Sequence, residues 1–241
     1  MNRIARTVQT SIGCKAVMAV TGLLLILFLI AHMLGNLQVY RGQDKYNEYA
    51  AMLKGLGPLL WAARGGLLVV FVVHILAGLR LNKQNRDARP EPYRFQALAQ
   101  QDAAQQARVR AAIYMLLSGL LILLFVLYHL AHFTLGWIDI GGTFQGRDDE
   151  GRHDVYSMFI TGFQQPLVAS TYVLAMLVLG AHLMHGMTSL FQTLGVDQPA
   201  VRGLIRVGGP LLVAIIVLGN CAMPLSILLL DFPALPGGTN G

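Results

Sequence analysis

The chain has 241 residues, of which 55% are hydrophobic and only 12% are charged, and its mean hydropathy is +0.56. A soluble globule of this length would have too few polar side chains to cover its surface, so the composition predicts a protein that lies in lipid. The formal net charge of +6 would suit nucleic acid in a soluble protein, but these basic residues flank apolar segments, where they set topology, and we expect no nucleic-acid partner.

Five apolar segments are long enough to cross a bilayer, whose hydrocarbon core needs about twenty helical residues. The first, at about residues 16–37, is too long for the apolar part of a signal peptide, so we expect it to remain as a helix. The other four are expected at about 59–81, 112–137, 166–190 and 208–230. The sequence predicts an all-α integral membrane protein of five transmembrane helices in a single domain, residues 1–241.

The segments between these spans are polar. We expect a short surface helix at about residues 46–56 and an Ala/Gln-rich helix outside the membrane at about 96–110. Residues 138–165 are expected to form an acidic outer loop in which His153 is solvated. If the N-terminus is cytoplasmic, twelve of the 18 Lys and Arg residues lie on the inner side, which favours that orientation.

Each of the first four spans carries a histidine: His32, His74, His129 and His182. An ionisable side chain within the membrane is costly and marks a functional site. Imidazoles are axial ligands of haem iron, and the core of a helix bundle is where such sites are built. Four histidines suit two bis-histidine haems, and the absence of a Cys-x-x-Cys-His pattern predicts haem b, held without covalent bonds.

Depth along each helix pairs these residues. His32 lies about fifteen residues into its span, which is about 22 Å from the entry side at 1.5 Å per residue. Because successive helices alternate in direction, we expect His32 and His129 nearer the outer face and His74 and His182 nearer the cytoplasm. Two neighbours one turn further on are alternative ligands: His132 and His185.

Glycines recur at fixed spacings from these histidines. Gly22 and Gly119 lie ten residues before the histidines of the first and third spans, and Gly78 and Gly186 lie four residues after those of the second and fourth. We expect these glycines to leave room for a planar macrocycle. The alternative is that they only allow close packing of transmembrane helices.

Three segments carry a resemblance to a known family: Ser118-Gly119 with His129-Leu130, His74-x-x-x-Gly78-x-Arg80, and His182-x-x-x-Gly186 ending at Phe191-Gln192-Thr193-Leu194-Gly195. Together they resemble the single-chain, di-haem cytochrome b anchor of succinate:quinone oxidoreductases, which include fumarate reductases. The resemblance covers nearly the whole chain. It implies that His32 and His129 hold a distal haem and that His74 and His182 hold a proximal one.

The resemblance also implies a function. The chain would be the membrane anchor of succinate dehydrogenase, an enzyme of the tricarboxylic acid cycle, or of fumarate reductase, in a bacterial cytoplasmic membrane. A flavoprotein subunit and an iron-sulfur subunit would dock on the cytoplasmic face, and the haems would relay electrons between the iron-sulfur subunit and menaquinone or ubiquinone. Alone, the chain is expected to be catalytically silent.

A quinone needs hydrogen-bond donors at an apolar boundary, and the outer end of the chain offers six candidates: Asn36, Gln38, Tyr40, Glu48, His132 and Trp137. Each could instead be an interfacial anchor or a loop residue. Gly180 stands where some fumarate reductases of this type have a Glu that is linked to proton movement.

Two alternatives remain open. A di-haem cytochrome b of another quinone-linked dehydrogenase or a hydrogenase would share the same four histidines. A haem-free, proton-coupled membrane protein would use them for protons, but such proteins more often have carboxylates in mid-membrane. The predicted spans contain no Asp or Glu.

Overall fold

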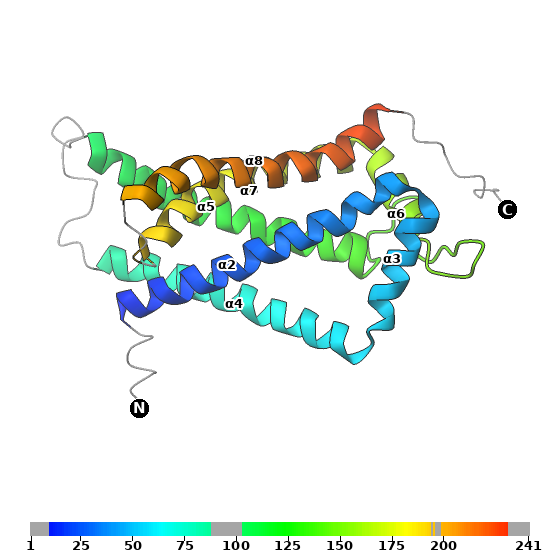
Figure 1. Cartoon of the computed structure of the whole chain (residues 1–241), viewed down its shortest axis with the longest axis horizontal. Coiled ribbons are helices and arrows are strands. Elements are labelled where there is room, and N and C mark those ends of the chain that lie inside the picture. Colours follow the sequence, from blue (N-terminus) through cyan, green and yellow to red (C-terminus); the bar gives the residue numbers. More distant parts are fainter. Residues whose placement is uncertain (1–9, 88–102, 194, 196–198, 231–241) are drawn as a thin grey trace. The chain divides into compact units, whose positions relative to one another are not determined.

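The computed structural model of the chain describes residues 10–87, 103–193, 195 and 199–230 (Figure 1). Within these residues there are seven α-helices and a single isolated bridge pair, so the predicted all-α class is confirmed. Five of the helices are long and apolar enough to cross a membrane: α2 (Ser11–Asn36), α4 (Pro58–Asp87), α5 (Ala103–His129), α7 (Pro166–Thr193) and α8 (Pro199–Leu229).

Large apolar side chains are exposed on all five of these helices. Examples are Leu27 at 55% exposure, Leu68 at 58%, Leu120 at 52%, Leu174 at 64% and Leu218 at 68%. Soluble proteins rarely expose contiguous apolar surface of this kind, whereas a lipid-facing helix requires it. Helix length and hydropathy together identify a multi-pass membrane protein.

The helices extend beyond the predicted spans. α4 continues to Asp87, and α5 begins at Ala103, so the later part of the predicted helix at 96–110 belongs to α5 and its earlier part lies outside the described residues. α8 begins at Pro199, a residue whose fixed φ suits the first position of a helix. Helical hydrogen bonding does not stop at the membrane boundary when good helix formers such as Ala, Gln and Arg follow.

The third span changes helix type at its C-terminal end. α5 ends at His129 and is followed by a π-helix, η2 (Leu130–Thr134). The backbone N–H of Leu135 donates to the carbonyl of Leu130 at 2.8 Å, which is the i to i+5 pattern of a π turn. π turns are rare and frequently occur at functional sites.

The segment before α7 differs from the predicted loop. It contains α6 (Val155–Gln164), whose first turn is capped by Asp154, because the Asp154 side chain accepts the N–H of Ser157 at 3.1 Å. His153, which was expected to be solvated, is half-buried, and its Nε2 lies 2.6 Å from the carbonyl oxygen of Phe144, to which it donates. A loop was predicted because the segment is acidic, but its last part is an apolar helix of ten residues.

The residue contacts divide the chain into two compact units. The first consists of Met1–Leu27, Gly65–Leu121 and Ala181–Val213, and the second of Phe28–Arg64, Ile122–Gly180 and Ala214–Gly241. His74 and His182 belong to the first unit, and His32 and His129 belong to the second.

The second unit has an apolar core in which five of the eleven buried residues are aromatic. The expected surface helix is α3 (Gln43–Gly55), which follows the 3-10 helix η1 (Leu37–Arg41) and packs against η1 and α6. The core residues come from these elements, α7 and α8: Val39, Tyr46, Tyr156, Phe159, Ile160, Phe163, Val168, Ala169, Tyr172, Met223 and Ile227.

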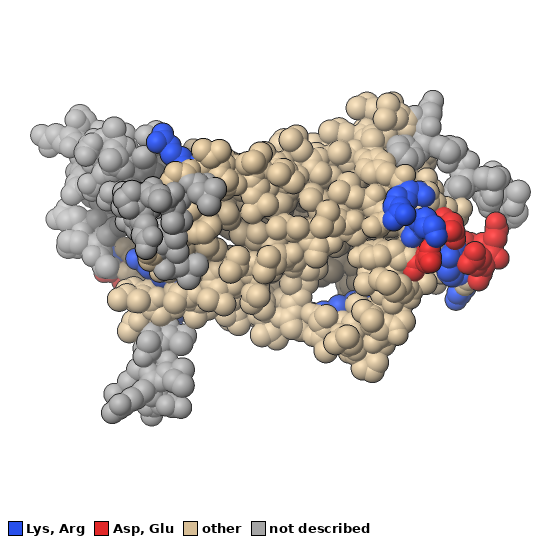
Figure 2. Space-filling view, in the orientation of Figure 1, with Lys and Arg blue, Asp and Glu red and all other residues tan. Residues whose placement is uncertain are grey.

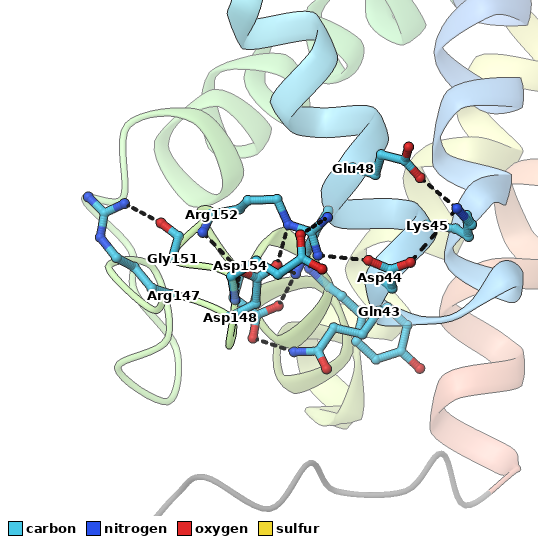
Figure 3. A network of polar contacts seen from close by, with 12 residues as sticks. Gln43, Asp44, Lys45, Glu48, Arg147, Asp148, Gly151, Arg152 and Asp154 are labelled. Carbon is cyan, nitrogen blue, oxygen red and sulfur yellow. Dashed lines mark hydrogen bonds and ion pairs between the residues drawn. The ribbon is translucent and has the colours of Figure 1, made fainter.

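A polar network joins α3 to the start of α6 (Figure 3). Asn47 is completely buried, and its amide donates to Asp154 Oδ1 at 3.0 Å and to Asp148 Oδ2 at 3.1 Å. The side-chain oxygen of Asn47, Oδ1, accepts the backbone N–H of Tyr156 at 3.0 Å. Arg152 adds ion pairs with Asp148 at 2.7 Å and with Asp44 at 2.9 Å. The network fixes the position of α6 relative to α3.

Acidic and basic side chains are paired in and around this network. On the face drawn in Figure 2, the acidic side chains gather in one group with basic ones, which corresponds to the ion pairs that Lys45 and Arg152 make with their acidic neighbours. Burial tends to raise the pKa of Asp154, but hydrogen bonds from Ser157, Asn47 and Gln43 outweigh it, so the pKa lies below the usual range. The carboxylate is therefore held in its charged form.

Candidate functional site

In the first unit, His74 of α4 is hydrogen-bonded by a hydroxyl of α2. Thr21 Oγ1 lies 2.9 Å from His74 Nδ1 and 2.7 Å from the carbonyl oxygen of Val17. The carbonyl can only accept, so this short contact favours a hydroxyl hydrogen directed to Val17 and an imidazole that donates through Nδ1–H. A neutral imidazole that carries its hydrogen on Nδ1 has a free lone pair on Nε2, which is the form that binds a metal ion.

His182 of α7 has the same arrangement with α5. Ser118 Oγ lies 3.0 Å from His182 Nδ1 and 3.2 Å from the carbonyl oxygen of Met115. A Ser118 hydrogen directed to Met115 would likewise give His182 an Nδ1–H and a free lone pair on Nε2. Two histidines on different helices thus present Nδ1 to hydroxyl groups on two further helices.

The glycines that follow these hydroxyl residues face the same imidazoles. A Cβ atom on Gly22 would lie 3.4 Å from His74 Cε1, and one on Gly119 would lie 3.6 Å from His182 Cε1. Gly78 faces Met18 Sδ instead, at 3.6 Å, and among the described residues nothing lies within 4 Å of a Cβ on Gly186. α2 and α5 therefore pass close to the imidazole edges, and a Cβ on either glycine would be at ordinary contact distance from them.

In the second unit, the rings of His32 and His129 are neighbours. Their centroids are 5.7 Å apart, and the ring planes are perpendicular, at 88°. Asn36 donates from its amide to His32 Nε2 at 3.1 Å and accepts the hydroxyl of Tyr46 at 2.9 Å. His32 is therefore oriented from its own helix, and its Nε2 is an acceptor.

The hydroxyl of Tyr172 in α7 lies between two histidines of the third span. It is 3.3 Å from His129 Nδ1 and 3.1 Å from His132 Nδ1. The side chain of Phe125 stacks on His129, with ring centroids 6.1 Å apart and an interplanar angle of 28°. His132, which sequence analysis considered as a ligand and as a quinone contact, is only 4% exposed and stacks on Phe133.

The remaining quinone-site candidates all lie in the second unit, but most have other partners. Tyr40 shares a hydrogen bond with Ser226 at 2.8 Å, and Glu48 pairs with Lys45 at 2.7 Å. Gln38 accepts a long hydrogen bond from Arg41, at 3.4 Å. Trp137 is 78% exposed, as expected of an interfacial anchor. Asn36 and His132 are the candidates that the structure connects with the histidine pair.

Sequence reasoning missed two residues that hold the imidazoles, Thr21 and Tyr172. Thr21 could have been recognised, because Thr21-Gly22 and Ser118-Gly119 have the same spacing to the histidines that follow them. Tyr172 has no comparable signal, since its contacts are with another helix and depend on the π turn after His129.

The donor set can be tested against a bis-histidine metal site. A metal–imidazole bond is about 2 Å long, so two rings on opposite sides of one ion have centroids on the order of 6 Å apart. The 5.7 Å between His32 and His129 agrees with this value. Binding through His32 Nε2 requires the Asn36 amide to release that nitrogen. In the first unit, the hydroxyl contacts at Nδ1 leave Nε2 as the ring nitrogen of His74 and His182 that could bind a metal.

The candidate site therefore consists of four histidines, two in each unit. Neighbouring hydroxyl, phenol and amide groups set the orientation of their rings. Comparison of the chain with protein-family models, with curated proteins and with solved structures finds no match.

Proposed function

We propose that the chain is a di-haem cytochrome b that carries electrons across a bacterial cytoplasmic membrane. His74 and His182 would bind one haem b, and His32 and His129 the other. Each haem would supply a one-electron redox centre with both axial positions filled by imidazole, which suits electron transfer better than binding of a substrate to iron.

The observation that carries the proposal is the matched support of His74 and His182. Both imidazoles present Nδ1 to a hydroxyl that also contacts a backbone carbonyl, an arrangement that favours donation of Nδ1–H to the hydroxyl. Metal-binding histidines nearly always donate their second ring N–H to an oxygen in this way, because the contact fixes the tautomer and raises the basicity of the ligand.

The protein's own residues have three tasks in this function. Thr21 and Ser118 hold the imidazoles, Gly22 and Gly119 keep large side chains away from the imidazole edges, and the apolar spans exclude water. A low-dielectric surrounding with fixed polar groups is what tunes the potential of a bound haem.

The resemblance supports a more specific assignment. We infer that the chain anchors a succinate dehydrogenase or fumarate reductase and passes electrons between its iron-sulfur subunit and a membrane quinone. The flavoprotein and iron-sulfur subunits would bind at the cytoplasmic side, where most of the basic residues are expected. Asn36 and its neighbours at the histidine pair of the second unit are the best candidates for contact with quinone.

The test is a reduced-minus-oxidised visible spectrum of the full chain purified in detergent, with haem b counted per polypeptide. We expect about two low-spin haems. His74→Ala and His182→Ala should each remove one and the same haem, and His32→Ala and His129→Ala the other. His153→Ala, which changes a histidine outside the spans, is the matched control and should retain both. A chain without haem, or full haem content in all four variants, would contradict the proposal.

A further inference from the structure

Tyr172 is the shared hydrogen-bond partner of His129 and His132. Its hydroxyl lies 3.3 Å from the Nδ1 of the first and 3.1 Å from the Nδ1 of the second. Tyr172 is 7% exposed and His132 is 4% exposed, so both are shielded from solvent. The hydroxyl therefore satisfies its hydrogen bonds within the protein.

The chemistry of these groups restricts the arrangement. A phenol has one hydrogen to donate, and a neutral imidazole has one N–H. Both histidines present Nδ1 to the same oxygen, and among the described residues the phenol has no other hydrogen-bond partner, so its hydrogen is satisfied only when one histidine accepts it and the other donates. The two histidines consequently take opposite tautomers.

His132 is held rigidly in this arrangement. His132 lies in the π-helix η2, one residue before Phe133. The rings of the two residues are stacked, with centroids 4.0 Å apart and an interplanar angle of 28°. An ideal Cβ on Gly162 of α6 would lie 3.3 Å from both Cε1 and Nε2 of His132 and 3.4 Å from Phe133 Cε1, so even a methyl group would be crowded there. Packing against Phe133 and Gly162 keeps the His132 ring directed toward Tyr172.

We propose that Tyr172 and His132 act together as positioning residues for His129. His129 donates Nδ1–H to Tyr172, and Tyr172 donates its hydroxyl hydrogen to His132 Nδ1. This direction leaves Nε2 of His129 free for iron and places the hydrogen of His132 on its own Nε2. His132 is then no alternative ligand but the residue that fixes the direction of the hydrogen bonds. The proposal rests on the proposed function, because it requires His129 to bind a haem.

The expected effect is on a redox potential. A histidine ligand that donates its second N–H to an acceptor is more basic and stabilises the oxidised metal. Tyr172→Phe removes the acceptor, so the potential of the haem that His129→Ala abolishes should become more positive. We expect a shift of the redox equilibrium on the order of threefold to tenfold, and tenfold corresponds to 59 mV for one electron.

The experiment is a spectroscopic redox titration of both haems in the full chain and in four variants. Tyr128→Phe is the matched control, because the Tyr128 ring contacts both Tyr172 and His132, while the hydrogen bonds to Nδ1 of both histidines come from Tyr172. His132→Phe should give a smaller shift of the same haem. The double variant Tyr172→Phe/His132→Phe should shift it no further than Tyr172→Phe alone, since the two residues act through one chain of hydrogen bonds.

Equal potentials in the Tyr172→Phe and Tyr128→Phe proteins, equal shifts of both haems, or additive effects in the double variant would overturn the proposal and leave the di-haem function intact. If Tyr172→Phe does not accumulate, His132→Phe decides, and an unchanged potential would overturn the proposal. A parent chain without haem would overturn the proposed function and the positioning role together.

Discussion

The hydroxyl of Thr21 offers the sharpest test of how His74 is held. Thr21→Val keeps the shape of the side chain but removes the acceptor for His74 Nδ1–H, which lies 2.9 Å away. Thr21 is 7% exposed, so little water can replace the lost hydroxyl. We expect the affinity for the haem that His74 binds to fall, while the other haem is retained.

The magnitude follows from the loss of one partner of a buried hydrogen bond. Leaving a buried donor unsatisfied costs about 1–3 kcal/mol, and 1.4 kcal/mol corresponds to a factor of ten in affinity. The expected loss is therefore about fivefold to a hundredfold. Substitutions of groups that orient metal ligands in other proteins cost about 10–100-fold, which agrees with this range.

The assay is the transfer of haem from the detergent-purified chain to an excess of a competing haem-binding protein, followed by its visible spectrum. Thr21→Ser is the matched control, because it keeps the hydroxyl and removes only the methyl group. The same comparison applies to His182, with Ser118→Ala as the test and Ser118→Thr as the control. Equal haem loss in Thr21→Val and Thr21→Ser would refute the reasoning, since packing and not the hydroxyl would then hold the imidazole.

Three further predictions concern packing, the polar network and pH. Gly22→Ala should retain haem, because its Cβ would be at ordinary contact distance from His74, whereas Gly22→Leu should lose it; haem content per chain measures both. Asn47→Ala should lower the free energy of unfolding by about 2–4 kcal/mol, because it leaves the Asp154 carboxylate and the Tyr156 N–H with fewer hydrogen-bond partners. Thermal unfolding measures this loss, and the exposed control Lys45→Ala should not show it. Because the folded-state pKa of Asp154 is lowered, its contribution to stability is present above the unfolded value of about 3.9 and is lost as the pH falls below it. Melting temperatures measured from pH 7 down to pH 3 should show this loss, and Asp154→Asn should flatten the curve.

The positions of the five spans could be predicted from sequence, but several of their ends could not. The apolar length needed to cross a bilayer locates a span. The helical extensions of α4 to Asp87 and of α5 from Ala103 are polar, so hydropathy does not reveal them. α6 was missed because its acidic neighbours gave the segment the composition of a loop. The capping contact of Asp154 with Ser157 was the local signal for it.

The candidate site divides in the same way. The sequence by itself determined which residues are exceptional, because a histidine in an apolar span stands out through its cost in lipid, and it placed Gly22 and Gly119 at a repeated distance from the histidines. The tertiary structure decided which groups hold each imidazole. The contacts of His74 with Thr21 and of His129 with Tyr172 join different helices, and they depend on the rotation of each helix and on the π turn after His129. Rotation and helix type arise from packing between segments far apart in the chain, and no local pattern of residues encodes them.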